Sequence, residues 1–275
     1  MPRFRLLIAY EGTDFHGWQR QEPPGLPALR TAQGTITDAV ADLFQVRVPV
    51  DGASRTDSGV HARGQVAAFT LAQSRIPHER LALALNTRLP RDIEVLEAAL
   101  APESFDPVRD CLSKSYSYTL QHGTTAGGVA TTRAGVFARR TTAHVRHPLD
   151  LAAMRSGASH MLGTHDFRAF AHNPEQRETT TRTVYGVTVT ALDEGLVRFD
   201  VAGSGFLHHM VRIMVGTLVE VGRGHLAPAA VGDVIASLDR SRAGRTMPPE
   251  GLCLEWIHYG GRDGRAATIA AESPS

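Results

Sequence analysis

The chain has 275 residues, of which 42% are hydrophobic and 21% are charged, which fits one large domain or two small ones. This balance excludes a disordered chain, because enough apolar surface can be buried to offset the entropy lost on ordering. No apolar run reaches the roughly 18 residues of a membrane span, residues 1–5 lead into no signal segment, and Cys111 and Cys253 match no metal or disulfide spacing. We therefore expect a soluble, cytoplasmic protein without disulfides.

The net charge is nearly neutral, and the basic residues are almost all arginine. Lysine and arginine total 29 against 28 acidic residues, which gives +1, and Lys114 is the single lysine. Arginine suits phosphate binding and base stacking, although a GC-rich genome produces the same bias. The segment 109–147 holds six basic residues and one acidic residue: Arg109, Lys114, Arg133, Arg139, Arg140, Arg146 and Asp110. It predicts either a phosphate-facing surface or a solvated loop, and charge alone leaves both open.

In the first half, the hydrophobic pattern predicts strands that alternate with helices. The apolar run 4–10 is typical of a buried strand, and a loop over 11–31 follows it. Apolar residues at helical spacing predict a helix with Thr35 as its N-cap. Short strands are expected at 47–50 and 65–70 around a polar turn at 51–64, and a second helix is expected at 77–85.

The second half shows the same pattern. Tyr116, Tyr118 and Leu120 alternate on one face of an expected strand. Further strands are expected at 184–190, 196–201 and 252–259, and helices at 149–162, 207–221 and 229–238. Each half is similar to a split β-α-β unit. We expect an α/β (α+β) fold with two lobes, 1–106 and 107–260, and a loose tail at 261–275.

The sharpest local feature is the loop 52–62, GASRTDSGVHA. Its small residues allow close backbone approach and expose the side chains of Arg55 and Asp57. A neighbouring arginine favours the ionised carboxylate, which can then act as a base or a nucleophile. An Asx-turn with a surface ion pair is the alternative.

A second feature is the segment 203–212, GSGFLHHMVR, in which a glycine-rich turn leads into an apolar helix. His208, Arg212 and Gly216 fall on one helical stripe. A buried arginine needs a carboxylate, for which Asp57 is a candidate, and a partly exposed arginine is the alternative. His208 and His209 lack the spacing of zinc motifs, and no phosphate-loop, dinucleotide or serine-hydrolase motif occurs, so we expect neither metal nor cofactor.

Five segments in this order resemble the tRNA pseudouridine synthase I (TruA-like) family. The loop RTDSGVHA at 55–62, with GQV at 64–66, is similar to the family's active-site loop. The other segments are YEGT at 10–13 with GWQR at 17–20, YSY at 116–118, FLHHMVR at 206–212 and PPEGL at 248–252. The resemblance spans about residues 3–259.

The resemblance implies an isomerase (an intramolecular transferase) that converts uridine to pseudouridine in the anticodon stem and loop of tRNA, at tRNA positions 38, 39 and 40, without metal or organic cofactor. It implies that Asp57 is the nucleophile, that Arg212 pairs with Asp57 and holds the flipped base, and that Tyr116 packs on that base. Arg55 and His61 are implied as further substrate-binding residues. The implied fold has two lobes, a largely antiparallel central sheet and a cleft between the lobes. A homodimer with tRNA across both subunits is also implied.

Two alternatives remain: a non-catalytic tRNA-binding or folding protein on the same scaffold, and a sibling synthase that acts on another RNA. The chain departs from the family pattern at three places. Phe105-Asp106-Pro107-Val108 replaces a segment with a basic residue, which puts an RNA contact there in doubt. Lys114 stands where arginine is common and loses its bidentate fork, and Met247 replaces a small residue, which we expect to affect packing only.

Overall fold

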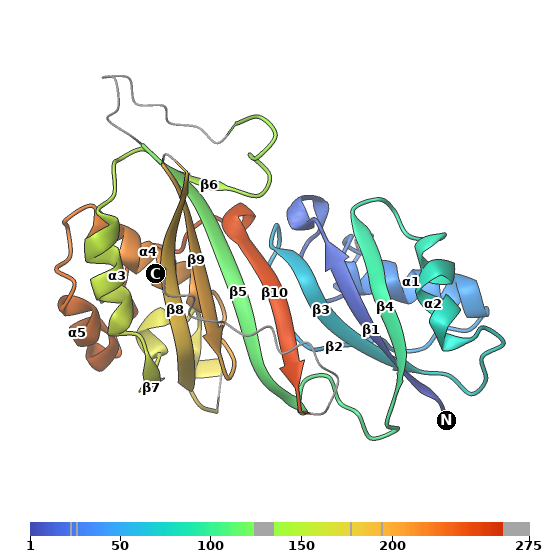
Figure 1. Cartoon of the computed structure of the whole chain (residues 1–275). Coiled ribbons are helices and arrows are strands. Elements are labelled where there is room, and N and C mark those ends of the chain that lie inside the picture. The colour runs from blue at the N-terminus through green and yellow to red at the C-terminus, as the bar shows by residue number, and fades with distance from the viewer. Residues whose placement is uncertain (23, 26, 124–134, 177, 194, 261–275) are drawn as a thin grey trace, which may run out of the picture.

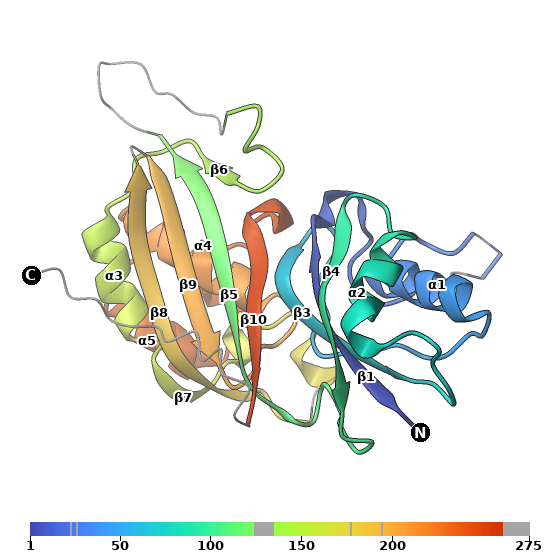
Figure 2. The same ribbon diagram turned by 45° about the vertical axis from the view of Figure 1, so that its right-hand side comes forward.

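A single mixed sheet runs through the molecule. The computed structural model describes residues 1–22, 24–25, 27–123, 135–176, 178–193 and 195–260. The strand order is β4-β1-β3-β10-β5-β9-β8-β7, with β2 paired to β3 and β6 paired to β5. The β3/β10 and β5/β6 pairs are parallel, and the other seven pairs are antiparallel. This confirms the expected α/β fold with a largely antiparallel sheet (Figures 1 and 2).

The first half contains β1 (Arg3–Tyr10), α1 (Ala32–Phe44), β2 (Asp51–Gly52), β3 (His61–Thr70), α2 (His78–Asn86) and β4 (Ile93–Ala101). Strand β1 buries every second side chain, because successive strand residues face opposite sides of a sheet. The predicted strand at 4–10 and the predicted helix at 77–85 are confirmed. Strand β3 begins at His61, four residues before the expected start.

Two expectations for the first half were wrong, and one strand was missed. Helix α1 is capped by Thr31, whose hydroxyl accepts the Gly34 N–H, so Thr35 lies inside the helix. The segment 47–50 forms no strand, and the two residues of β2 pair with β3 instead. Strand β4 was not expected, because its sequence IEVLEAALA gives no clear alternation of apolar and polar residues.

The second half contains β5 (Cys111–His122), β6 (Ala143–Val145), α3 (Leu151–Ser159), β7 (Gly163–Asp166), β8 (Thr181–Asp193), β9 (Leu196–Gly203), α4 (Met210–Gly222), α5 (Ala230–Ser237) and β10 (Leu252–Tyr259). All expected elements of this half are present, whereas β6 and β7 were not predicted. Helix α4 begins three residues later than expected, because His209 has a left-handed backbone with φ 62°. The tail expected at 261–275 lies outside the described residues.

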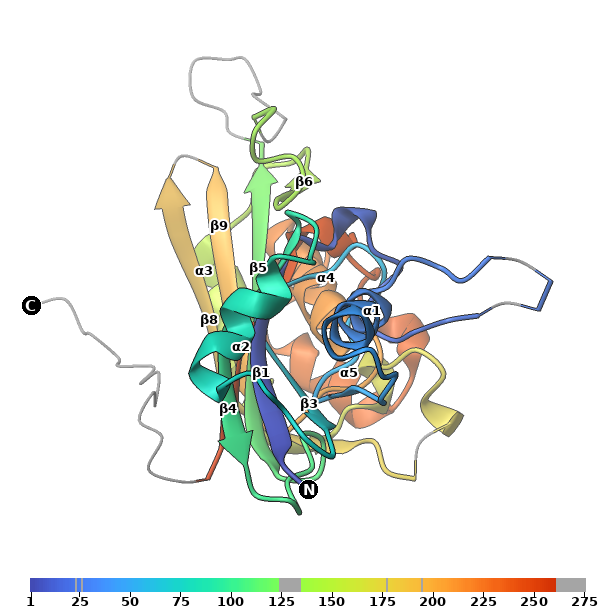
Figure 3. The same ribbon diagram turned by 90° about the vertical axis from the view of Figure 1, so that its right-hand side faces the viewer.

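Helix α4 is the centre of the second half. It is apolar on nearly every side, and all but two of its residues are buried, which is typical of a core helix. Figure 3, which views the sheet nearly edge-on, shows α1, α4 and α5 on the same side of it. In the described ranges no helix combines the length and apolar character required to cross a membrane.

Strand β10 joins the two halves of the sheet. Cys253 and Leu254 pair in parallel with His61 and Ala62 of β3, and the other edge of β10 pairs antiparallel with β5. The loop that leads into β3 and the centre of β5 therefore flank the same strand. The expected division between residues 106 and 107 falls on the connection between β4 and β5.

Candidate active site

The loop 53–60, which leads into β3, is fixed by backbone hydrogen bonds to the segment 15–18. The Trp18 N–H donates to the Thr56 carbonyl at 3.0 Å, and the Gly59 N–H donates to the Phe15 carbonyl at 3.2 Å. Gly17 has φ +83°, and a Cβ at this position would lie 2.6 Å from the Thr56 carbonyl oxygen. This contact therefore requires glycine at position 17. The backbone that carries Asp57 is thus held in place by residues 15–18.

Arg212 of α4 reaches Asp57 across 155 residues of sequence. Its Nη1 donates to Asp57 Oδ2 at 2.9 Å, and its Nε donates to the Met247 carbonyl at 2.7 Å. The side chains are 12% (Arg212) and 22% (Asp57) exposed, so the ion pair is largely shielded from water. Two bonds from different nitrogens fix the plane of the guanidinium. The structure thus brings together the two segments that the sequence analysis singled out.

Two histidines flank the same carboxylate. His208 Nε2 lies 3.4 Å from Asp57 Oδ1, and His209 Nε2 lies 3.4 Å from Oδ2. Burial, together with the neighbouring charges of His208 and Arg212, lowers the pKa of His209 to about 4, although the charge of Asp57 opposes the shift. The His209 ring is therefore neutral near pH 7. His208 precedes α4, so the helical stripe expected for it does not exist. The left-handed turn at His209 instead sets both rings beside Asp57.

Tyr116 of β5 forms an aromatic wall near this cluster. Only 6% of it is exposed, its hydroxyl lies 2.8 Å from Ser54 Oγ, and its ring meets Phe206 edge-on at 5.3 Å. Burial raises the pKa of Tyr116 to about 12, and the charge of Asp57 contributes to the rise. The side chain is thus a neutral phenol at physiological pH.

A buried polar network lies behind the loop, and the sequence analysis did not identify it. Gln65 donates to the Ser54 carbonyl at 2.6 Å and accepts from the Ser54 N–H at 3.2 Å. The Tyr10 hydroxyl lies 2.8 Å from Thr56 Oγ1. Buried polar groups that satisfy one another fix a single local conformation. The available signal was that Tyr10 and Gln65 both fall inside the segments that carry the family resemblance.

The structure does not bring Arg55 and His61 into contact with Asp57. Arg55 is exposed and makes no hydrogen bond or ion pair with any described residue. His61 is 6% exposed, and its ring nitrogens are occupied by the Gly12 N–H at 2.9 Å and the Glu250 carbonyl at 3.2 Å. Burial lowers the pKa of His61 despite the nearby charge of Glu11.

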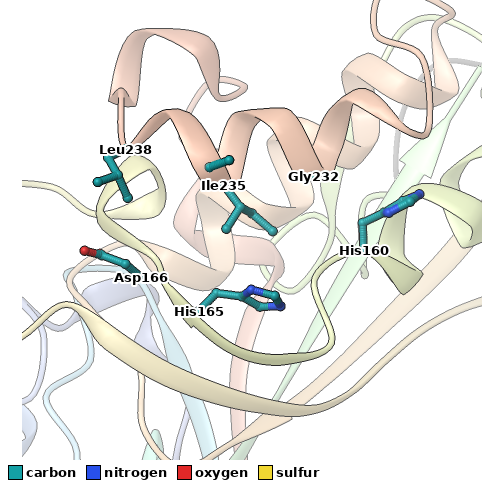
Figure 4. A pocket seen from close by; sticks show the side chains of 7 residues that line it. His160, His165, Asp166, Gly232, Ile235 and Leu238 are labelled. Atoms are coloured by element: carbon teal, nitrogen blue, oxygen red, sulfur yellow. The ribbon is translucent and has the colours of Figure 1, made fainter.

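Two hollows lie away from this cluster. One of about 390 Å³ is lined in part by His61, Ser117 and Arg198, and it lies on the face of β5 opposite Tyr116 because strand side chains alternate. The other, of about 260 Å³, lies between α5 and β7 (Figure 4). Its His165 contacts the Leu162 carbonyl at 2.7 Å, and its Asp166 accepts from the Thr180 hydroxyl at 2.6 Å. These polar groups are thus already engaged within the protein.

The basic segment 109–147 does not form one surface in the described residues. Arg109 precedes the first residue of β5, whereas Arg140 precedes β6, which pairs in parallel with the last residues of β5, so Arg140 lies level with the middle of β5. Arg140 pairs with Glu11 at 2.9 Å and Asp14 at 3.1 Å. Arg133 lies outside the described residues.

The residues at the three departures from the family pattern all make defined contacts with other parts of the chain. The Asp106 carboxylate accepts the Val108 N–H at 2.8 Å and closes a turn. The Lys114 ammonium donates to the Ala53 carbonyl at 2.7 Å, and burial lowers the pKa of Lys114. Met247 is fully buried, as packing requires, and its carbonyl also holds Arg212.

Comparison with known proteins gives consistent matches over most of the chain. A family model described as tRNA pseudouridine synthase matches residues 6–109 and 158–260. The chain is 40% identical over 259 residues to the tRNA pseudouridine synthase A of Acetivibrio thermocellus, covering 94% of this chain and 100% of that protein. It is 40% identical over 267 residues to the protein of the same name from Myxococcus xanthus, covering 97% and 95%. A solved archaeal box H/ACA sRNP Nop10-Cbf5 complex matches at 12% identity and TM-score 0.32, covering 90% of this chain and 46% of that chain.

Proposed function

Because the chain belongs to the tRNA pseudouridine synthase family, we propose that it isomerises uridine to pseudouridine in the anticodon stem and loop of tRNA, at positions 38, 39 and 40. The observation that carries the proposal is the 2.9 Å ion pair between Asp57 and Arg212. This pair joins the loop 55–62 to the segment 206–212, the two segments richest in chemistry-bearing residues.

The reaction breaks the N1–C1′ bond of uridine and forms a C5–C1′ bond. C5 gives up a proton and N1 gains one, so the product is an isomer and no oxidant or reductant takes part. Asp57 is the group we assign to the chemistry. Its Oδ2 accepts the bond from Arg212, which leaves Oδ1 as the oxygen that meets the nucleoside. Arg212 also stops the carboxylate from rotating and offsets its charge.

The target base must leave the helical stack before its ring can be reached, which costs a few kcal/mol. We assign Tyr116 to pack on the flipped base, with Phe206 supporting its ring at 5.3 Å. An aromatic contact of this kind returns about 1–3 kcal/mol per base. Arg55, exposed beside the site, is assigned to a phosphate. His61 was expected to bind substrate, but it is buried and both of its ring nitrogens are occupied, so we assign it instead to hold Gly12 and the Glu250 segment in place.

The wider arrangement is also part of the proposal. Residues 1–106 and 107–260 act as two lobes that meet at β10, and the partner is tRNA. Two copies of the chain form a homodimer in the cytoplasm, with tRNA across both subunits. Light scattering of the purified protein measures the dimer, and a monomer at working concentration would contradict it.

The deciding experiment maps pseudouridine in tRNA transcripts incubated with the purified protein. We expect modification confined to the anticodon arm, without added metal or nucleotide. Asp57→Asn keeps the size of the side chain and removes its charge, so we expect tRNA binding within a few-fold of wild type and no pseudouridine. Asp233→Asn, at an exposed position of α5, is the matched control and should react normally.

Each contrary result excludes a defined part of the proposal. Turnover by Asp57→Asn would remove Asp57 from the role of nucleophile. Modification in a different arm or a different RNA would indicate a sibling synthase. A wild-type protein that binds tRNA without modifying it would be the non-catalytic alternative.

A further inference from the structure

Three side chains at the candidate active site are arranged as metal ligands. The ligand atoms of Asp57, His208 and His209 all lie within 4.8 Å of one another. Each imidazole Nε2 lies 3.4 Å from a carboxylate oxygen of Asp57. Ligands held at about 2.1 Å around a tetrahedral zinc ion are themselves about 3.4 Å apart. We propose that these three residues form a binding site for Zn²⁺ that blocks the enzyme while it is occupied.

The ligand set selects the kind of cation. Two imidazoles and one carboxylate, with a fourth position open, suit zinc and its first-row neighbours. Magnesium and calcium prefer oxygen ligands and are disfavoured here. The rings of His208 and His209 make no hydrogen bond to another described residue, so their nitrogens are available. The position of His208 is supported by its carbonyl, which accepts the His172 N–H at 3.0 Å.

Arg212 is the main obstacle to a second cation at Asp57, because its guanidinium already bonds Oδ2, the carboxylate oxygen that lies 3.4 Å from His209. Oδ1 accepts no bond from Arg212 and lies 3.4 Å from His208, so a metal ion that takes Oδ1 and His208 must also draw the His209 ring toward Oδ1. Neighbouring positive charge weakens the site, and we therefore expect reversible binding that a chelator removes. Oδ1 is also the oxygen that the proposed reaction uses, so an occupied site cannot react. The inference that bound Zn²⁺ inhibits the reaction rests on the proposed function, whereas the inference that Zn²⁺ binds at these residues does not.

The binding test uses the full-length, EDTA-treated protein without RNA. Titration calorimetry with Zn²⁺ should show one saturable site, and Co²⁺ at the same site should give the visible absorption of a tetrahedral complex. His208→Gln and His209→Gln should each lower the Zn²⁺ affinity at least about tenfold, since even changes behind the metal ligands cost 10–100-fold. His160→Gln, at an exposed histidine outside the cluster, is the matched control and should bind as wild type does. No saturable Zn²⁺ binding, or binding unchanged in both cluster variants, would overturn the site.

The activity test compares pseudouridine formation with Zn²⁺ and with an equal concentration of Mg²⁺. Zn²⁺ alone should inhibit, EDTA should restore the rate, and the two cluster variants should need more Zn²⁺ in proportion to their lost affinity. Zn²⁺ bound at these residues with an unchanged rate would overturn the inhibitory role. A wild-type protein that forms no pseudouridine in Mg²⁺ alone would refute the proposed function and leave the binding result standing.

Discussion

The change Arg212→Lys tests the ion pair on which the proposed function depends. Lysine keeps the positive charge but replaces a planar fork with a single ammonium group. Arg212 bonds Asp57 at 2.9 Å and the Met247 carbonyl at 2.7 Å through different nitrogens. A lysine side chain placed for one of these acceptors is poorly placed for the other. The variant should therefore lose one of the two contacts while the net charge of the site stays the same.

The expected loss follows from the burial of the pair. Both side chains are less than a quarter exposed, so the contact counts as a charged hydrogen bond, worth about 1.5–3 kcal/mol. If that free energy is lost from the transition state, the rate falls by about 10- to 150-fold, because 1.36 kcal/mol corresponds to a factor of ten.

The assay is single-turnover pseudouridine formation with enzyme in excess, which separates chemistry from tRNA binding and product release. Arg223→Lys is the matched control, because Arg223 caps the same helix and pairs with Glu220 at 3.2 Å away from Asp57. We expect normal rates for the control and tRNA affinity within a few-fold for both variants. A wild-type rate for Arg212→Lys would refute the reasoning that the pair positions the carboxylate.

Three further predictions concern the surroundings of the site. Gly17→Ala should lower the free energy of unfolding by about 1–3 kcal/mol. The control is Gly224→Ala, because Gly224 has a similar φ of +75° but open space where a Cβ would lie, so its loss should be smaller. Equal losses in urea titrations would show that the contact between residue 17 and Thr56 is unimportant. Tyr116→Phe should cost about 1 kcal/mol of stability through the unpaired Ser54 hydroxyl, yet keep pseudouridine formation within about tenfold, and a larger loss of rate would assign the phenol group a chemical role. Burial lowers the pKa of His209 from 6.5 to about 4. Between these pH values the unfolded chain therefore binds more protons than the folded chain. The wild-type protein should thus lose up to about 3 kcal/mol of its free energy of unfolding as the pH falls from 6.5 to 4. His209→Gln should lack that part of the loss, and identical pH profiles from chemical denaturation would contradict it.

The hydrophobic pattern of the sequence predicted those helices and strands whose burial is visible within their own residues. The alternation in β1 and the apolar run of α4 are legible in sequence because one face, or the whole surface, of each element is buried. The start of α1 depends instead on a distant segment. The N–H groups of Ala32 and Gln33 donate to the carbonyls of Gly17 and Trp18, so the helix gains a turn before the expected cap at Thr35.

Part of the candidate site could also be predicted from the sequence. Asp57 and Arg212 could be proposed as partners because a buried arginine requires an anion. The positions of His208 and His209 depend on one left-handed residue at the start of α4, which no periodicity indicates. Arg212 also bonds the backbone carbonyl of Met247. Every residue carries such a carbonyl, so the side chain at position 247 could not have indicated this contact.

The position of β10 has a consequence for how the protein is made. A ribosome synthesises residues 252–259 after every other strand of the sheet, yet this strand lies between β3 and β5. A nascent chain that stops short of it already carries Asp57 and Arg212 but lacks the strand that joins its halves. Domains tend to fold as they emerge from the ribosome, so each half has time to collapse before the closing strand arrives. Premature termination just before residue 252 would therefore yield a product that contains every residue assigned to the site, and we expect it to form no pseudouridine.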